Sequence, residues 1–303
     1  MSTADAPAAP AAAAAPAERK LRHPALQFIV SQPTGTAGLV VIVVMMLAGL
    51  FAEVVAPYDP VAINFAAMLT GPSAEHWMGT DAFGRDVLSR LIYGARTALA
   101  IGILSSALGS GIGAVIGIAS AYFGGMIDNA IQRLMDVLLA FPIIVLALAV
   151  VAVLGKWPVL GLDLNLIVAI AIPMIPKVAR VVRSSALTIR ELAYVDAARA
   201  AGYDHSRIIF RHIAPNVVAP FMIMFTAFIA QAILLEASLS FLGLGVTEPT
   251  AAWGLMLSGT SQSFYSQAPW MIIFPGLAIS LAVFAFNLFG DSLRDYLDPR
   301  FKI

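Results

Sequence analysis

The sequence predicts an all-α membrane protein with about six transmembrane helices. Of its 303 residues, 60% are hydrophobic and only 12% are charged, whereas a soluble domain carries about 25% charged residues. Several stretches without charge are as long as the about 20 apolar residues that cross a bilayer core, and the mean hydropathy is +0.87. The 18 basic and 18 acidic residues balance, and no cysteine is present. This composition excludes a basic protein that binds nucleic acid, a disulfide framework and a thiolate metal site.

The N-terminal region predicts a disordered tail followed by an uncleaved anchor. Residues 4–17 are almost entirely Ala and Pro, a low-complexity pattern without a periodic apolar face. The basic residues Arg19, Lys20 and Arg22 follow this stretch instead of preceding it, which is not the order of a signal peptide. The apolar run Ala37–Ala52 comes next without a small-residue cleavage site after it, so we expect it to remain as the first span.

Gaps between charged residues mark the expected spans. They place six spans at 37–56, 98–121, 131–154, 164–182, 217–242 and 270–290. Four spans contain a proline, which can kink a membrane helix; these are Pro142, Pro173, Pro220 and Pro275. The expected divisions are a disordered tail with its basic flank (1–34), a first anchor with an outer segment (35–97), a membrane core with a polar loop at 188–215 (98–290) and a C-terminal tail (291–303).

The distribution of Lys and Arg predicts that both termini lie in the cytoplasm. With the N-terminus inside, fourteen of the 18 basic residues fall on the inner side. The other four, on the outer side, are Arg85, Arg90, Arg96 and Lys156. Because basic residues near membrane helices favour the cytoplasm, the inverted arrangement is disfavoured.

The second span carries glycines at a regular spacing. Gly109, Gly113 and Gly117 lie four residues apart, and Gly102 precedes them. Glycines on one helix face allow another helix to approach closely in lipid. The stripe therefore predicts a tight helix contact, either within this chain or with another subunit.

The polar loop 188–215 predicts a compact pair of helices. Residues 193–201 favour a helix, Gly202 suits its C-terminal cap, and Asp204 can cap a second short helix that ends before Pro215. The small residues on the first helix predict a knob shaped for a partner's cleft. The alternative is an amphipathic helix on the lipid headgroups, with Arg199, Arg207 and Arg211 at the phosphates.

Four motifs resemble the dipeptide and oligopeptide branch of the ABC importer permeases. Asp196–Gly202 (DAARAAG) with Pro215 resembles the cytoplasmic EAA loop, in which Ala197, Ala198, Gly202 and Pro215 match in register. Asp196 replaces the glutamate of that pattern, and His212 and Ala214 replace its Ile and Leu. The other three motifs are GTDAFGRDVLSRLIYGAR (Gly79–Arg96), LSFLGLG (Leu239–Gly245) followed by Trp253–Gly254, and GDSLRDYLDP (Gly290–Pro299).

The resemblance implies the binding-protein-dependent permease fold, in the C-type subunit of a bacterial peptide importer in the inner membrane. It implies four kinds of partner besides membrane lipid: a second homologous permease, two cytoplasmic ATPases and an external substrate-binding protein. ATP and Mg would bind to the ATPases, so this chain would hold no cofactor or metal. It assigns ATPase coupling to Asp196, Ala197, Ala198, Gly202, Arg207 and Pro215. Ala198 is expected to meet the socket of the ATPase.

The segment Gly79–Arg96 predicts an amphipathic helix lying at the outer surface. Its charged residues are Asp81, Arg85, Asp86 and Arg90, and Val87 and Leu91 lie on its apolar face. We expect it to shape the outer vestibule or to contact the receptor; plain anchoring at the interface is the alternative.

Other functions find less support in the sequence. It has no Gly-x-x-x-x-Gly-Lys-Ser/Thr loop, no His-Glu-x-x-His and no Gly-x-Ser-x-Gly, so neither nucleotide binding nor hydrolysis is predicted. A secondary transporter would usually show repeated halves, which are not found. Glu236, the one acid deep in the fifth span, is either a pathway or gate residue or a structural hydrogen-bonding group. The cargo stays open among peptides, nickel complexes and other small solutes.

Overall fold

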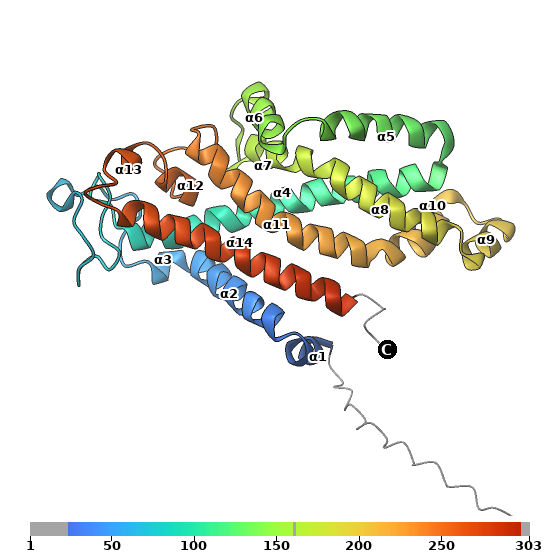
Figure 1. The fold of residues 1–303 in the computed structure, drawn as a ribbon, viewed down its shortest axis with the longest axis horizontal. Helices are drawn as coiled ribbons and strands as arrows, with labels where there is room; N and C mark the ends of the chain where they lie inside the picture. Colours follow the sequence, from blue (N-terminus) through green and yellow to red (C-terminus); the bar gives the residue numbers. More distant parts are fainter. Residues whose placement is uncertain (1–23, 160–161, 298–303) are drawn as a thin grey trace, which may run out of the picture.

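The computed structural model describes residues 24–159 and 162–297. Its long helices run roughly along one axis of the molecule (Figure 1). Five helical runs are long and apolar enough to span a membrane: α2 (Pro33–Leu50), α4 (Val87–Phe123), the run Leu164–Arg190, the run His205–Phe241 and α14 (Trp270–Leu297). A sixth span results if α5 (Gly125–Leu139) and α6 (Ile143–Leu154) are counted together. The predicted helical membrane fold is therefore confirmed.

Two of these runs contain more than one kind of helix. Leu164–Arg190 consists of α7 (Leu164–Ala171), a 3₁₀ turn (Ile172–Met174) and α8 (Ile175–Arg190). His205–Phe241 consists of α10 (His205–Ile208), a π-helical turn (Ile209–Ile213), a 3₁₀ turn (Ala214–Val217) and α11 (Val218–Phe241). The remaining elements are short: α1 (Pro24–Ser31), α3 (Ala52–Val55), a 3₁₀ turn (Phe65–Ala67), α9 (Ala193–Ala200), α12 (Trp253–Met256), α13 (Thr260–Ser263) and the antiparallel hairpin of β1 (Pro158–Val159) and β2 (Leu162–Asp163).

The helix α4 is the centre of the bundle and packs against α8, α11 and α2. A Cβ atom added at Gly109 would lie 2.7 Å from the carbonyl oxygen of Ala171, and one added at Gly117 would lie 2.5 Å from that of Ala179. The glycine stripe therefore lets α4 approach the run Leu164–Arg190 at backbone distance, at the end of α7 and along α8. Of the two predicted contacts, the one within this chain is found.

Several spans differ from the sequence prediction: the run expected at 164–182 continues to Arg190, and the run expected at 217–242 begins at His205. The second span begins at Val87 instead of residue 98, because Asp86 caps the helix there. The third is bent by 95° between α5 and α6, where Pro142 precedes α6. The last helix runs on to Leu297, past the expected boundary at 290.

The described part of the chain begins with a short helix. Residues 24–31, which we placed with the tail and its basic flank, form α1. The Phe28 ring packs edge-on against Phe289 and Tyr296 of α14, with ring centroids 6.0 Å and 5.4 Å apart. The predicted disorder of residues 4–17 falls outside the described residues.

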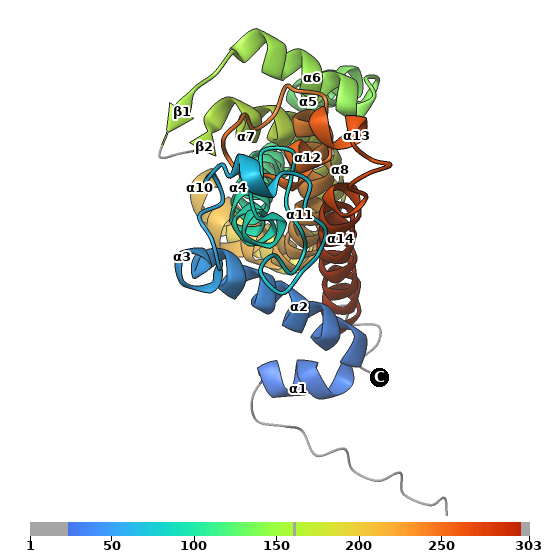
Figure 2. The ribbon, with the colours of Figure 1, turned by 90° about the vertical axis from the view of Figure 1, so that its left-hand side faces the viewer.

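The two ends of the bundle differ in character. One end, here called the α9 end, carries α9 and α10; the other, the α12 end, carries α12, α13 and the loop 56–86 (Figure 1). Figure 2 looks onto the α12 end, where this loop lies in front of α4. The chemistry predicted from the sequence thus falls at opposite ends of one bundle.

Candidate functional site

At the α9 end, α9 finishes in a left-handed turn at Gly202. The φ angle of Gly202 is 77°. The N–H of Tyr203 donates to the Ala198 carbonyl at 3.1 Å and the N–H of Gly202 donates to the Arg199 carbonyl at 3.0 Å, which is the Schellman pattern that caps a helix with glycine. A Cβ atom at Gly202 would meet nothing within 4 Å. Glycine is therefore needed here for its backbone conformation and not for space.

One face of α9 is fixed to its own chain. Val195 is 0% exposed and Ala198 is 5% exposed, and both belong to the core cluster that includes Ile208 and Ile213. The expectation that Ala198 faces a partner's socket is therefore wrong, because the side chain lies against this chain's own core. The other predicted coupling residues are exposed; they are Asp196, Ala197, Gly202, Arg207 and Pro215.

The second predicted helix does not end at Pro215. Pro215 lies in the first turn of the 3₁₀ segment Ala214–Val217, where proline needs no N–H donor, and the helical run continues to Phe241. Asp204 stands at the N-cap position of α10, but its side chain makes no capping bond to the backbone. It accepts a hydrogen bond from the Ser206 hydroxyl at 2.5 Å instead.

The end of α4 is tied to the α9–α10 region by side chains. The Tyr122 hydroxyl lies 2.7 Å from Nδ1 of His205. The guanidinium of Arg190 donates to the Ala121 carbonyl at 2.7 Å, which satisfies a carbonyl that the end of α4 leaves free. The Arg199 guanidinium carbon lies 6.0 Å from the centre of the Tyr122 ring. The knob therefore contacts the long central helix directly.

A stack of side chains next to α9, with Arg207 and Tyr203 exposed and His212 half-buried, was missed from the sequence. The Arg207 guanidinium carbon lies 4.0 Å from the centre of the Tyr203 ring. That ring stacks on His212, with centroids 6.2 Å apart and an angle of 19°. The spacing of these residues along an irregular helical segment gave no periodic signal.

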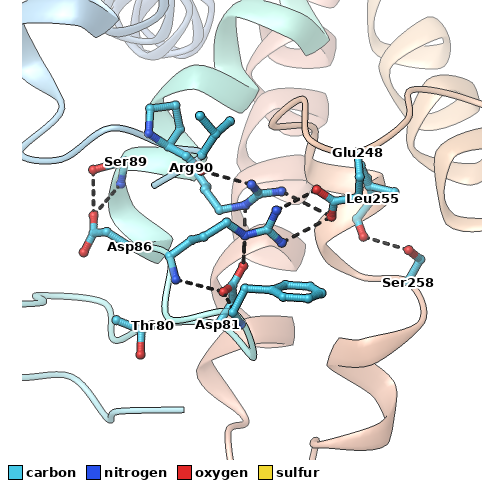
Figure 3. Close-up of polar contacts among 12 residues, drawn as sticks. Thr80, Asp81, Asp86, Ser89, Arg90, Glu248, Leu255 and Ser258 are labelled. Atoms are coloured by element: carbon cyan, nitrogen blue, oxygen red, sulfur yellow. Dashed lines mark hydrogen bonds and ion pairs between the residues drawn. The ribbon is translucent and has the colours of Figure 1, made fainter. Parts of the chain in front are cut away.

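At the α12 end, four charged residues form what we call the Arg85 cluster: Asp81, Arg85, Arg90 and Glu248 (Figure 3). Arg85 Nε lies 2.6 Å from Asp81 Oδ2. Its two terminal nitrogens reach the Glu248 carboxylate, Nη1 at 2.6 Å from Oε2 and Nη2 at 3.2 Å from Oε1. This two-pronged geometry is the strong form of an arginine–carboxylate pair.

Arg90 stands behind Arg85 and is only 1% exposed. Its Nη1 donates to the Pro60 carbonyl at 3.1 Å. Its Nε lies 3.9 Å from Asp81 Oδ2 and its Nη2 lies 3.7 Å from Glu248 Oε1. The expected surface helix is therefore wrong, because residues 87–96 are the first turns of α4 and the Arg90 side chain is buried there.

Asp86 does not join the cluster and caps α4. Its Oδ2 accepts from the Ser89 N–H at 2.8 Å and from the Ser89 hydroxyl at 2.7 Å. Its Oδ1 lies 2.9 Å from His76 Nδ1, and the residue is 3% exposed. A carboxylate at a helix N-terminus is also favoured by the helix dipole.

The electrostatics of the cluster favour full ionisation of Arg85. Burial of the Arg85 guanidinium acts to lower its pKa, but the hydrogen bonds to Glu248 and Asp81 outweigh burial and raise the pKa above the ordinary arginine value. The cluster is thus two cations and two anions held in a largely buried setting.

Glu248 is the cluster residue that the sequence analysis missed. It lies 163 positions from Arg85, so no local spacing connects the two. One signal was available: Glu248 is the only charged residue between Glu236 and Asp291.

The loop that carries Glu248 is seated on α4 by close backbone packing. Trp253 Nε1 donates to the Leu91 carbonyl at 2.9 Å, and a Cβ at Gly94 would lie 2.5 Å from Trp253 Cδ1. Thr97 Oγ1 donates to the Ala251 carbonyl at 2.9 Å. Gly254 lies against the Ala237 backbone so closely that it has no room for a Cβ atom. The Trp253–Gly254 motif therefore holds this loop in place.

Glu236 is 1% exposed within α11. Ser240 Oγ donates to its Oε1 at 2.7 Å, and Ser240 Oγ in turn accepts from the Val246 N–H at 3.0 Å. Its Oε2 is buried and has no hydrogen-bond partner among the described residues. Glu236 thus helps hold the start of the loop and retains one free oxygen.

No group of three metal-ligating side chains occurs among residues 24–159 and 162–297.

Two family models match the chain. The model for the binding-protein-dependent transport system inner membrane component matches residues 113–303. The model for the N-terminal transmembrane domain of oligopeptide transport permease C matches residues 25–72.

Individual relatives agree with the family models. The dipeptide transport system permease protein DppC of Alkalihalophilus pseudofirmus is 44% identical over 265 residues, which cover 88% of this chain and 85% of that protein. The glutathione transport system permease protein GsiD of Pectobacterium atrosepticum is 44% identical over 267 residues, which cover 88% and 86%.

A solved structure shares the fold. An inward-facing conformation of the MetNI methionine ABC transporter matches with a TM-score of 0.55 and 19% identity, over 70% of this chain and 98% of that chain. Systems of the matched type work with a substrate-binding protein, and an ABC system uses an ATPase. The chain belongs to the family of inner-membrane components of binding-protein-dependent transport systems, as a multi-pass permease without a catalytic role.

Proposed function

We propose that the chain is the permease subunit of an ATP-driven importer that carries small peptides into the bacterial cytoplasm. The names of the dipeptide and glutathione permeases among its relatives support this cargo class. The proposed assembly contains a second homologous permease, two cytoplasmic ATPases and an external substrate-binding protein. ATP and Mg bind to the ATPases in this proposal, because this sequence has no phosphate-binding glycine loop.

The proposed orientation places the α9 end in the cytoplasm. Fourteen of the 18 basic residues fall on that side when both termini are inside. In this orientation the Arg85 cluster faces outward, toward the substrate-binding protein. We propose that Asp81, Arg85 and Arg90 shape the outer vestibule there, while Asp86 acts as the cap that positions them.

The observation that carries the proposal is the exposed knob of α9 and Gly202. Val195 and Ala198 fix one face of α9 to this chain's own core, and Asp196 and Ala197 present the opposite face to a partner. A short helix fixed on one side and free on the other is suited to fill a cleft. We propose that this cleft belongs to the ATPase.

Two contacts provide a route from the knob into the membrane. His205 of α10 bonds to Tyr122 at the end of α4, and Arg190 of α8 bonds to the Ala121 carbonyl next to it. When the ATPase pulls on α9, the end of α4 moves with it. For Glu236 we propose a pathway or gate role, supported by the free, buried oxygen Oε2.

The test is the substitution Gly202→Val in the complete importer. A β-branched residue is forced into a left-handed backbone, at a cost of about 1–3 kcal/mol, so the turn after α9 changes shape. We expect normal membrane insertion but loss of peptide uptake, either because the ATPase no longer co-purifies or because hydrolysis no longer drives transport. The measurements are co-purification, ATP hydrolysis and uptake in proteoliposomes.

Two controls accompany this variant. Gly111→Ala changes a glycine of α4 whose added Cβ meets nothing within 4 Å at an ordinary backbone angle, and Val43→Leu changes an exposed residue of α2. Both should transport normally. Full uptake by the Gly202 variant would show that the knob is not the coupling element, and uptake by the lone chain in an ion gradient would favour a secondary transporter.

A further inference from the structure

The Arg85 cluster forms one wall of a pocket of about 180 Å³ at the α12 end. The rest of the lining is apolar or hydroxylic. It includes Phe83, whose ring centre lies 4.7 Å from the Arg85 guanidinium carbon, and Leu255, Met256, Met271, Ser258 and Ser261. Figure 3 shows Glu248 between Arg90 and the turn that carries Leu255 and Ser258. A pocket lined by both charged and apolar side chains suits the charged end of a small organic ligand.

The two carboxylates of the cluster are held very differently. The Asp81 side chain is 10% exposed. Its Oδ1 accepts from the Phe83 N–H at 2.8 Å and from the Arg85 N–H at 3.0 Å, in addition to the Arg85 Nε contact of its Oδ2. The Glu248 side chain is 49% exposed; among the described residues its carboxylate hydrogen-bonds to Arg85 and lies 3.7 Å from Arg90 Nη2, with no backbone donor. Glu248 can therefore leave toward water, whereas Asp81 cannot leave without stranding backbone donors.

If the Glu248 carboxylate moves away from the cluster, the two arginines lack one of their two counter-ions. Arg85 and Arg90, with side chains 9% and 1% exposed, would then face each other with Asp81 as their one carboxylate. An unpaired buried charge is costly, so the open arrangement is stable only when a second anion takes the place of Glu248. Arginine side chains match the planar shape of a carboxylate.

We propose that this pocket binds the C-terminal carboxylate of a small peptide at Arg85 and Arg90, and that Glu248 is the internal carboxylate displaced by it. The displaced Glu248 then lies beside the bound end and pairs with the peptide's ammonium group. This inference rests on the proposed peptide cargo. The volume is below the about 300–1,000 Å³ typical of pockets for whole drug-sized ligands, so the site takes one or two residues at a peptide's end.

The site is tested by binding measurements on the assembled permease–ATPase complex in nanodiscs, without the substrate-binding protein. The probes are dialanine, its C-terminal amide and N-acetyl-dialanine, and the binding of each is measured by ligand-observed NMR titration. We expect the amide to bind at least about tenfold more weakly than dialanine, which corresponds to about 1.4 kcal/mol. Equal binding of acid and amide would overturn the proposal.

The variant Glu248→Gln tests whether the peptide carboxylate displaces Glu248 or is only attracted by the two arginines. Glutamine has no charge with which to hold Arg85, so N-acetyl-dialanine, which has no ammonium group, should bind several-fold more tightly than to the unchanged complex. Dialanine should gain less, because its ammonium group loses a partner. The control Glu53→Gln removes a carboxylate 3.6 Å from Arg96, both exposed at the same end, and should change neither affinity.

The outcomes distinguish this inference from the proposed function. Uptake of dialanine by the complete importer, without binding to the isolated complex, leaves the peptide importer standing and overturns the pocket. An unchanged affinity of Glu248→Gln for N-acetyl-dialanine also overturns it, even where docking of the substrate-binding protein weakens. Carboxylate-dependent binding by an importer that transports no peptide supports the pocket and overturns the proposed function.

Discussion

The Tyr122 hydroxyl and Nδ1 of His205 lie 2.7 Å apart, and their rings meet edge to face at 5.5 Å. Tyr122 is next to the last residue of α4, a helix of 37 residues whose first turn holds Arg90. At about 1.5 Å per residue such a helix is about 55 Å long. One rigid element therefore joins the α9–α10 region to the Arg85 cluster.

Removal of this hydroxyl should weaken coupling without unfolding the chain. Tyr122→Phe deletes one hydrogen bond worth about 0.5–1.5 kcal/mol and keeps the ring between Arg199 and His205. We expect more ATP hydrolysed per peptide imported in proteoliposomes. Tyr93→Phe, on the same helix, is the control, and an unchanged ratio in Tyr122→Phe would exclude this contact as part of the route.

Two neighbouring alanines of α9 should respond oppositely to the same change. Ala198→Leu places a large side chain in the core, where overpacking typically costs about 1–3 kcal/mol, so the melting temperature in detergent should fall. Ala197→Leu adds the side chain on the exposed face, so the melting temperature should hold while ATPase co-purification drops. Equal melting temperatures for the two variants would contradict the burial of Ala198.

Glycines of α4 should be sensitive according to what faces them. Gly117→Ala puts a Cβ 2.5 Å from the Ala179 carbonyl oxygen, so α4 and α8 must separate and thermal stability should fall. Gly111→Ala meets no neighbour and should be neutral or stabilising by up to about 1 kcal/mol, the propensity difference between the two residues. Thermal unfolding followed in detergent compares the pair, and a Gly117 variant as stable as the Gly111 variant would argue against the close helix contact.

Topology reporters should place both termini on the same side. A reporter fused after Lys302 should report a cytoplasmic location, and one inserted at Ser73 should report the outside, because this arrangement puts most basic residues inside. An external C-terminus would reverse the assignment of the two ends and remove the α9 region from contact with a cytoplasmic ATPase.

Composition and periodicity were enough to predict the helical membrane fold and the turn at Gly202, because both depend on local chemistry. Apolar runs of bilayer length and a glycine after a small-residue helix are signals within single segments. The bend at Pro142 and the burial of Ala198 depend on which helix lies alongside. That information is spread over distant residues.

The Arg85 cluster was only half predictable for the same reason. Asp81, Arg85 and Arg90 lie close in sequence, and their mixed charges marked the segment. Their burial follows from Asp86 starting α4 earlier than hydropathy suggests, and their partner Glu248 lies in the loop after α11, 163 positions from Arg85. The isolated charge of Glu248 in a long apolar region was the one sequence signal for its contact with Arg85.

The Arg85–Glu248 contact also governs how chimaeras between related permeases can be made. It crosses residue 113, where the match to the inner-membrane component model begins. An exchange at that point separates the arginines from their carboxylate, and the Trp253 ring from its glycine at position 94. Grafts should therefore succeed when the loop around Glu248 travels with the first turns of α4 from the same parent, and fail when a junction divides the two.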